Sequence, residues 1–415
     1  MKRRILLIAT ALILAVVAIA WPRDQFVASN SAADWAPTSA NIARGAYLAR
    51  AGDCVACHTV RGGAPYAGGR ALATPFGTLY GPNLTPDNAT GLGRWNADDF
   101  WGALHNGRSQ DGRYLYPAFP FPHYTKTTRA DSDALYAYLR SLAPVQQANR
   151  PHAMQFPFNT QVALAGWRLF YFKPGVFAPT PARDAAWNRG AYLIEGLGHC
   201  SACHSARNVF GASSQGLTGG MIPVLNWYAP SLSGTTMPQA DLVQLLHTGV
   251  APNATVIGPM AEVVARSLQY LAPEDVHAMA VYLKALPQAD VDADGGIKMK
   301  PSSDAMTAGA AIYKQHCMDC HGSDGQGQPS AYPALAGNRT LTTTPPVNAI
   351  RIVLQGGFPP GTAGNPRPYG MPPFAHVLDD AEVANVLTYV RSSWGNRGGE
   401  VMAAEVNQYR GAGLE

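Results

Sequence analysis

The sequence is poor in charge and in cysteine. Charged residues occupy 14% of the 415 positions, and they form no long run of one sign. The chain therefore lacks both the basic surface that nucleic-acid binding requires and the acidic tract typical of a disordered tail, so no nucleic-acid partner is expected. Hydrophobic residues, at 47%, are sufficient for globular domains, and the length indicates roughly two to four of them.

The six cysteines leave none over for structural disulfides, because all of them belong to one repeated motif. Two thiols one helical turn apart add to the two vinyl groups of a porphyrin, while the histidine that follows reaches the iron. The sequence therefore predicts three covalently bound haem c groups. The motif, Cys-x-x-Cys-His, comprises Cys54, Cys57 and His58, then Cys200, Cys203 and His204, then Cys317, Cys320 and His321.

Two other chemistries use Cys-x-x-Cys pairs. Zinc needs a second pair of ligands to complete its tetrahedron, and no unit of this sequence supplies one. A redox-active disulfide would leave unexplained the histidine that follows every pair. Haem is the interpretation that accounts for all three copies.

Each motif lies between two amphipathic segments, and this arrangement repeats three times. The segment before the motif carries a glycine, Gly45, Gly190 or Gly309, where another helix can cross closely. The sequence thus predicts an all-α fold of three tandem class I cytochrome c domains. The segments that close the units are expected at Asp131–Leu142, Pro273–Leu286 and Asp379–Trp394.

The N-terminus predicts export. An apolar run, Ile5–Ala20, follows the basic triplet Lys2–Arg4, which is the layout of a secretory signal or a short membrane anchor, with a buried core helix as the alternative.

The expected boundaries are a signal peptide or anchor at 1–21, a linker at 22–40, cytochrome c domains at 41–150, 186–287 and 304–397, an aromatic connector at 151–185, a linker at 288–303 and a tail at 398–415. Packing between the first two domains is the favoured role of the connector, and a partner or lipid surface is the alternative.

Each iron also needs a ligand on its other face, and methionine is a common choice. Met260 and Met371 stand on proline-bounded loops before the closing segments of the second and third units, so we expect them to be the sixth ligands. Methionine is otherwise a flexible filler of cores. That role is expected for Met221, Met237, Met279, Met306 and Met402.

The corresponding loop of the first unit carries Phe119, which cannot ligate iron. Met154 is the one methionine between His58 and the second motif, and it lies beyond the closing segment. His123 on the same loop is therefore the candidate ligand, giving a bis-histidine iron of lower potential. The alternatives are a surface or hydrogen-bonded histidine and a five-coordinate iron. His105 and His247 occupy matching places in two units, which favours a structural role for both.

The chain resembles the triple-haem cytochrome subunit of the membrane-bound periplasmic dehydrogenases of oxidative bacteria. Matching stretches extend over nearly the whole sequence, and they include Gly81–Pro86, Ala143–Gln147, Trp187–Leu193, Gly196–Cys200 and Gly258–Val264. The resemblance implies an electron-transfer subunit without a substrate site, at the periplasmic side of the inner membrane, which passes electrons from a catalytic dehydrogenase subunit to membrane ubiquinone.

The catalytic partner of such subunits differs between branches of the family. It is a pyrroloquinoline-quinone alcohol dehydrogenase, a flavin dehydrogenase for gluconate, sorbitol or fructose, or a molybdenum and iron-sulfur aldehyde dehydrogenase or hydroxylase. The loop with Phe119 and His123 looks more like the molybdenum branch, which implies an aldehyde-oxidising complex with a small iron-sulfur subunit.

Two rival functions remain open from the sequence. A freestanding diffusible electron carrier would use the same haems without a permanent partner. A haem enzyme, such as a peroxidase or a nitrite reductase, would need an iron with an open position.

Overall fold

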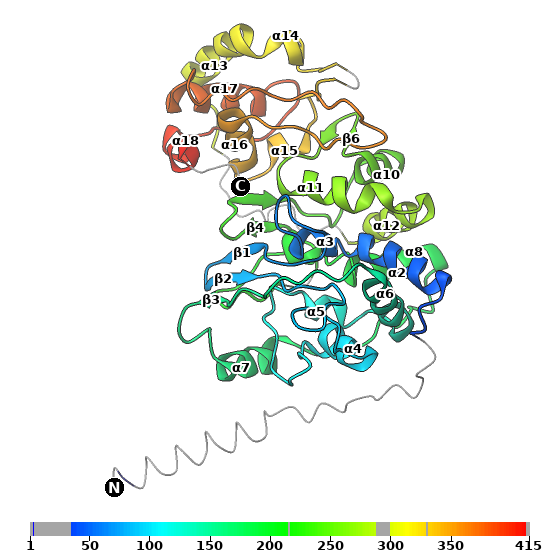
Figure 1. Cartoon of the computed structure of the whole chain (residues 1–415). Helices are drawn as coiled ribbons and strands as arrows, with labels where there is room; N and C mark the ends of the chain where they lie inside the picture. The colour runs from blue at the N-terminus through cyan, green and yellow to red at the C-terminus, as the bar shows by residue number, and fades with distance from the viewer. Residues whose placement is uncertain (1–2, 4–34, 215, 288–298, 329–330, 412–415) are drawn as a thin grey trace. The chain divides into compact units, whose positions relative to one another are not determined.

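The computed structural model describes residue 3 and residues 35–214, 216–287, 299–328 and 331–411 (Figure 1). Most of the expected signal or anchor segment at 1–21 and most of the linkers at 22–40 and 288–303 lie outside these residues. Within the described part of the chain, no helix has both the length and the apolar character needed to cross a membrane.

The chain divides into two compact units. The first contains residues 1–179 and 195–199, and the second contains residues 180–194 and 200–415. The first Cys-x-x-Cys-His motif belongs to the first unit, and the other two motifs belong to the second. The separate boundaries of the second and third domains stay a prediction.

Helices make up most of the regular structure, and they follow one order three times: a lead-in helix, a one-turn helix at the motif, a middle helix and a closing helix. The lead-in helices are α2 (Ser39–Ala51), α8 (Ala185–Glu195) and α13 (Ser303–His316). The motif helices are α3 (Cys54–Cys57), α9 (Ser201–His204) and α14 (Met318–His321). The middle helices are α4 (Ala97–Asn106), α10 (Gln239–Thr248) and α16 (Val347–Gln355), and the closing helices are α6 (Arg129–Ser141), α12 (Pro273–Ala285) and α17 (Asp380–Ser392).

Among the described residues, five more helices and one 3-10 turn lie between or after these. They are α5 (Phe121–Tyr124), α7 (Gln161–Tyr171), α11 (Pro259–Arg266), η1 (Leu268–Tyr270), α15 (Arg339–Thr342) and α18 (Ala403–Arg410). Each of α5 and α11 carries a candidate sixth ligand, whereas Met371 lies on the loop between α16 and α17.

The lead-in helix crosses the closing helix at glycine in all three repeats. A Cβ atom on Gly45 would overlap the carbonyl oxygen of Ala134 in α6, and one on Gly190 would overlap that of Ala278 in α12. Gly309 stands in the same relation to Asn385 in α17. The predicted crossing is confirmed in all three repeats. It brings the backbones of the lead-in helix and the closing helix together beside the motif.

Hydrophobic cores form around these crossings. In the first unit, Leu48 of α2 packs with Leu135 and Leu139 of α6 and with Leu104 of α4. Another core joins α13, α16, α17 and α18. Its buried members include Tyr313, Ile350, Leu354, Val383, Leu387 and Val406.

The expectation of an all-α fold is wrong, because the described residues also form three small antiparallel sheets. The first has the order β1-β2-β3, and the others are the two-stranded ribbons β4-β5 and β6-β7. The strands are β1 (Ala71–Thr74), β2 (Gly77–Tyr80), β3 (Ala153–Met154), β4 (Gly220–Ile222), β5 (Trp227–Ala229), β6 (Val250–Ala251) and β7 (Ala254–Thr255). Strands of two to four residues are too short to show an alternating pattern in sequence.

The aromatic connector packs on the first unit through part of its side chains. The Phe121 ring of α5 meets Phe172 edge-on at 4.7 Å between centroids and Trp167 at 6.2 Å. Phe156 and Phe170 are instead 81% and 77% exposed. Some rings of this segment are therefore packed on the first unit and others are exposed, and the expected packing between the first two domains stays a prediction.

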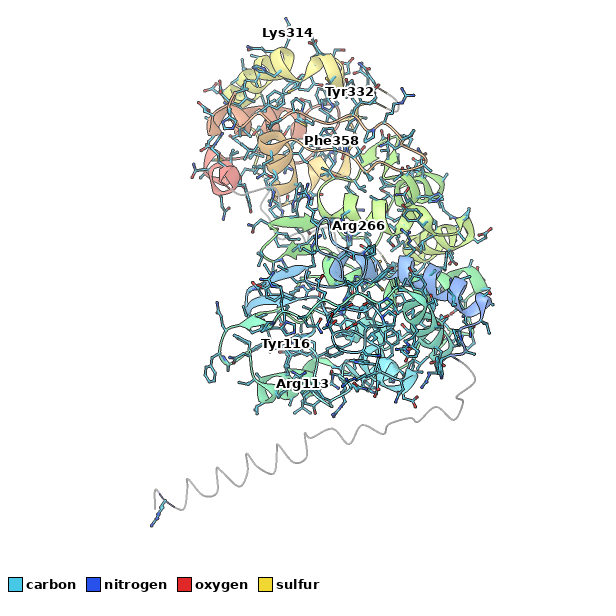
Figure 2. The ribbon with its side chains drawn as sticks, in the orientation of Figure 1. Arg113, Tyr116, Arg266, Lys314, Tyr332 and Phe358 are labelled. Carbon is cyan, nitrogen blue, oxygen red and sulfur yellow. The ribbon has the colours of Figure 1, made fainter. Side chains whose placement is uncertain are left out.

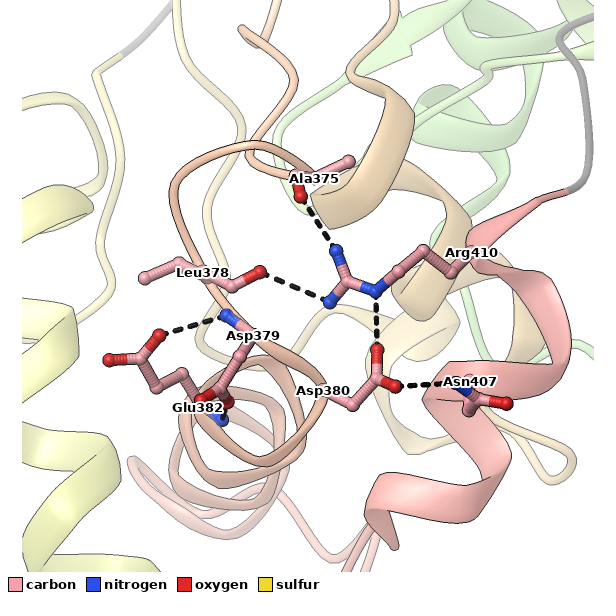
Figure 3. Close-up of polar contacts among 7 residues, drawn as sticks. All are labelled: Ala375, Leu378, Asp379, Asp380, Glu382, Asn407 and Arg410. Atoms are coloured by element: carbon pink, nitrogen blue, oxygen red, sulfur yellow. Dashed lines mark hydrogen bonds and ion pairs between the residues drawn. The ribbon is translucent and has the colours of Figure 1, made fainter.

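The C-terminal tail contributes a helix that the sequence did not predict. Helix α18 docks on the start of α17, where Asp380 accepts hydrogen bonds from Asn407 at 2.7 Å and from Arg410 at 2.5 Å (Figure 3). Arg410 also donates to the carbonyl oxygens of Ala375 and Leu378. Residues 403–410 are thus part of the third helical repeat.

Candidate haem attachment sites

Each motif folds into a single helical turn that is closed by its own backbone. The amide of His58 donates to the carbonyl of Cys54 at 3.2 Å, and the equivalent bonds in the second and third motifs measure 2.9 and 3.0 Å. This turn places two thiols and a histidine on one short element, as covalent attachment of one porphyrin requires.

The three motif histidines share a second contact. The Nδ1 atom of His58 lies 2.8 Å from the carbonyl oxygen of Pro82, and His204 and His321 make the same contact with Pro230 at 2.7 Å and Pro333 at 3.0 Å. A carbonyl oxygen can only accept, so the proton is on Nδ1 and the lone pair is on Nε2. Each ring is thereby oriented and left in the tautomer that ligates iron.

Burial keeps these rings neutral. It lowers the pKa of His58, His204 and His321 below the usual 6.5 in each case, against the smaller opposing effect of the carbonyl bond. A neutral imidazole is the form that binds a metal.

The first thiol of each motif is also partly buried. Burial raises the pKa of Cys54 and Cys200 to about 12 and that of Cys317 to about 11. Such thiols are protonated at neutral pH, whereas reactive disulfide pairs and zinc sites use thiolates. In the described part of the chain, no group of three or more histidine, cysteine, aspartate or glutamate side chains assembles as a metal site would require.

Met260 is the second residue of α11, directly after a glycine turn. Gly258 has a φ of 61°, and a Cβ at this position would lie 2.8 Å from the indole of Trp227. The close packing of backbone on an aromatic ring fixes where α11 begins. Arg266, labelled in Figure 2, ends the same helix and pairs with Glu262 at 3.2 Å.

Met371 is held by the backbone of the segment after α16. Its amide donates to the carbonyl of Gly357 at 2.8 Å, and its own carbonyl accepts from the amide of Gly357 at 3.1 Å. A Cβ on Gly370 would overlap the ring of Phe358, which is labelled in Figure 2. Met371 thus stands on a constrained loop as expected, whereas Met260 lies in the first turn of α11 and not on a loop; the ligation of iron by both stays a prediction.

His123 lies on α5, the one-turn helix of the first unit, and is partly buried. Phe119, in the place where methionine was expected, packs on the core that also contacts Cys54, and its ring meets Tyr124 at 5.3 Å. Phe119 is therefore a packing residue. The assignment of His123 as an iron ligand stays a prediction.

The structural role expected of His105 and His247 is confirmed. His105 of α4 donates from Nδ1 to the carbonyl of Thr125, which caps α5, and His247 of α10 donates from Nε2 to Gln269 in η1, after α11. Both bonds tie the middle helix to the segment that carries the candidate sixth ligand. In the third repeat, backbone hydrogen bonds tie the middle helix α16 to the segment that follows Met371. The amides of Phe374 and Ala375 donate to carbonyl oxygens of α16.

Sequence reasoning missed the three prolines whose carbonyls orient the motif histidines. They follow their histidines by 24, 26 and 12 positions, and this irregular spacing hides them. The signal present in the sequence is a proline followed by a small polar or apolar residue, in Pro82-Asn83, Pro230-Ser231 and Pro333-Ala334.

Comparison with known proteins agrees with this geometry. The family model for cytochrome c matches residues 42–143 and 306–394. The gluconate 2-dehydrogenase cytochrome c subunit of Pantoea cypripedii is 40% identical over 388 residues, which cover 88% of each chain. The chain belongs to the family of dehydrogenase cytochrome c subunits. This membership confirms an electron-transfer protein and haem c as its type of cofactor.

Other relatives of this cytochrome c subunit carry different substrates in their names. The cytochrome c subunit of the quinone alcohol dehydrogenase of Komagataeibacter europaeus is 36% identical, over 90% of this chain and 85% of the relative. A nicotinate dehydrogenase subunit of Pseudomonas putida is 42% identical over 85% of this chain, and the match spans only 30% of that protein's length.

Proposed function

We propose that this cytochrome c subunit holds three haem c groups and relays electrons from a periplasmic dehydrogenase to membrane ubiquinone. The observation that carries the proposal is the histidine-to-proline-carbonyl bond, which occurs at all three motifs. The cysteine pairs of the three motifs would attach the haems. The iron ligands would be His58 with His123, His204 with Met260, and His321 with Met371.

The cofactor supplies one-electron exchange between ferrous and ferric iron. The chain's own residues keep each proximal imidazole neutral and oriented, and they place apolar side chains around the attachment cysteines. A buried, oriented ligand changes little between the two oxidation states, which favours rapid transfer. Carriers of single electrons connect a two-electron substrate oxidation to a two-electron quinone.

The proposed partner is a molybdenum and iron-sulfur dehydrogenase that oxidises aldehydes, with a small iron-sulfur subunit. Support for this branch comes from the Phe119 and His123 loop, in which a core-packing phenylalanine stands where other branches carry methionine. Quinoprotein alcohol dehydrogenase and flavin dehydrogenases for gluconate or fructose are the alternatives, favoured by the names of several relatives.

The proposed location is the periplasmic side of the inner membrane. The basic triplet Lys2–Arg4 and the apolar run Ile5–Ala20 support export of the chain, and either cleavage or retention of this segment is compatible with that.

Purification of the native complex tests the partner. We expect the subunit to co-elute with a protein that contains molybdenum and iron-sulfur centres, and reduced haem to be reoxidised by a ubiquinone analogue. Pyrroloquinoline quinone or flavin in the complex would replace the aldehyde assignment. Elution of the chain alone would favour a freestanding carrier.

His123→Ala tests the first iron. We expect this variant to change the spectrum of one haem out of three and to raise its midpoint potential, because a nitrogen ligand is lost. His277→Ala is the control, since His277 is exposed on α12 and bonds the Gln239 side chain of the second repeat. A first haem with unchanged spectrum and potential in His123→Ala would contradict the bis-histidine assignment.

A further inference from the structure

Two side chains of α16, in the third repeat, hold a strand of the second repeat. Asn348 accepts from the amide of Tyr228 at 2.9 Å and donates to the carbonyl of the same residue at 2.7 Å. The Asn348 side-chain amide thereby makes the pair of hydrogen bonds that a neighbouring strand would make at this edge of β5. The other edge of β5 pairs with β4.

Arg351, one turn later on α16, reaches the start of the same strand. It is only 2% exposed, and its Nη1 donates to the carbonyls of Leu225 at 2.5 Å and Asn226 at 3.2 Å. Its guanidinium carbon lies 4.6 Å from the centre of the Trp227 ring. A buried cation is thus fixed against β5 by two carbonyls and an aromatic face.

Strand β5 contacts the segments that bear both candidate axial ligands of the second motif. Pro230, which follows β5, accepts the Nδ1 proton of His204 at 2.7 Å. Trp227, at its start, packs against Gly258, two residues before Met260. The proximal ligand and the distal loop therefore depend on one short strand, and α16 fixes that strand.

In the first repeat, other contacts hold the corresponding strand. Its strand β2 pairs with β3 from the connector that follows the first repeat, and Arg150 lies over the ring of Tyr80 at 3.9 Å. Arg150 is exposed, so water screens its charge. Arg351 is 2% exposed, so water screens its charge less than that of Arg150.

We propose that Asn348 and Arg351 are positioning residues for the second haem site: they hold β5 so that both axial ligands are fixed, and the buried guanidinium raises the reduction potential of that site. This inference rests on the proposed haem at Cys200 and Cys203 with His204 and Met260 as ligands. A fixed positive charge in a low-dielectric surrounding favours the reduced state, because ferric haem carries one more positive charge.

The test is a spectroelectrochemical titration of the full-length haem-loaded protein. Met260→His first assigns the second haem, since it moves one midpoint potential. Arg351→Gln is expected to lower that same midpoint and to weaken the charge-transfer band of methionine-ligated ferric haem. Arg351→Lys is expected to restore most of the potential. Asn348→Ala, which changes no charge, is expected to weaken the band with a smaller shift of potential.

Arg391→Gln is the matched control. Arg391 is 1% exposed and also bonds carbonyls, but those of Leu341, Thr343 and Gly398 within the third repeat. We expect it to leave the second midpoint unchanged. An unchanged second midpoint in Arg351→Gln, or an equal shift in Arg391→Gln, would overturn the inference. If Met260→His moves no midpoint, the ligand assignment is wrong and the inference falls with it.

Discussion

Glycine at the helix crossing shows how a single residue decides whether a repeat can close. The lead-in glycine was evident in the sequence because it recurs before each motif, and its position against the closing helix is confirmed at Gly45, Gly190 and Gly309. The sequence did not reveal which backbone atoms each glycine meets, since partners that lie far along the chain carry no local signal.

Gly45→Ala is expected to destabilise the protein by about 3 kcal/mol, because the added methyl group overlaps backbone atoms of α6 that cannot rotate away. Chemical denaturation measures the change. Gly166→Ala in α7 is the matched control: its Cβ meets nothing within 4 Å, and we expect a gain of about 0.5–1 kcal/mol from helix propensity. Equal effects of the two variants would contradict the crossing.

An ion pair beside the corresponding crossing of α8 with α12 also contributes to stability. Arg189 binds both oxygens of Asp275, at 2.7 and 2.6 Å, with side chains 36% and 12% exposed. Arg189→Met is expected to cost about 2 kcal/mol, less than for a fully buried pair because water reaches the arginine. Arg113→Met is the control, since Arg113 and Asp111 are 69% and 51% exposed. We expect a loss below about 0.5 kcal/mol there, and denaturation midpoints compare the two.

At the scale of elements, the lead-in and closing helices were predictable, whereas helix α18 and the strands were not. The closing segments were expected within two residues of their observed bounds, because each has an acidic or capping start and an apolar stripe. Strand β5, with three residues, has neither signal. Its existence depends on β4 and on Asn348, both of which are partners in space and not neighbours in sequence.

The docking of α18 on α17 predicts a pH dependence at Asp380. Hydrogen bonds from Asn407 and Arg410 lower the pKa of this carboxyl below its ordinary 3.8. A depressed folded-state pKa stabilises the protein above 3.8, and this contribution disappears as the pH falls through the folded value. At about pH 7, Asp380→Asn is expected to speed amide hydrogen exchange in α18.

The difference between Asp380→Asn and the unaltered protein is expected to shrink as the pH falls through the lowered pKa of Asp380 and to vanish below it, because the carboxyl is then protonated in both folded and unfolded chains. Amides of α2 serve as the internal control, since α2 belongs to the other compact unit. A difference in α18 exchange that persists unchanged at the lower pH would exclude the carboxylate as its cause.

For the whole molecule, the sequence predicted three repeats but not their grouping into compact units. The second and third motifs share one compact unit, and side chains of the third repeat such as Asn348, Arg351 and Thr362 bond the second repeat. The candidate sites were likewise predictable only in part. The motif histidines and cysteines were found from sequence alone, whereas the proline carbonyls that orient them required the fold.

Haem content is the measurement that applies to the molecule as a whole. We expect three haem c groups per chain, measured as the pyridine haemochrome relative to protein mass. The double variant Cys54→Ala with Cys57→Ala is expected to lose one third of the signal, and so is Cys200→Ala with Cys203→Ala. A chain with two haems, or a double variant that retains all of them, would contradict the proposal.

The contacts between α16 and β5 restrict which hybrids of this chain and its relatives can keep the fold. The linker expected at residues 288–303 is the natural crossover point in the sequence. A crossover there, however, would combine Asn348 and Arg351 of one parent with Leu225–Tyr228 of another. Hybrids joined near residue 180, the border of the second compact unit, would inherit both sides together. Shuffling in this family is therefore expected to move the last two cytochrome modules as one block.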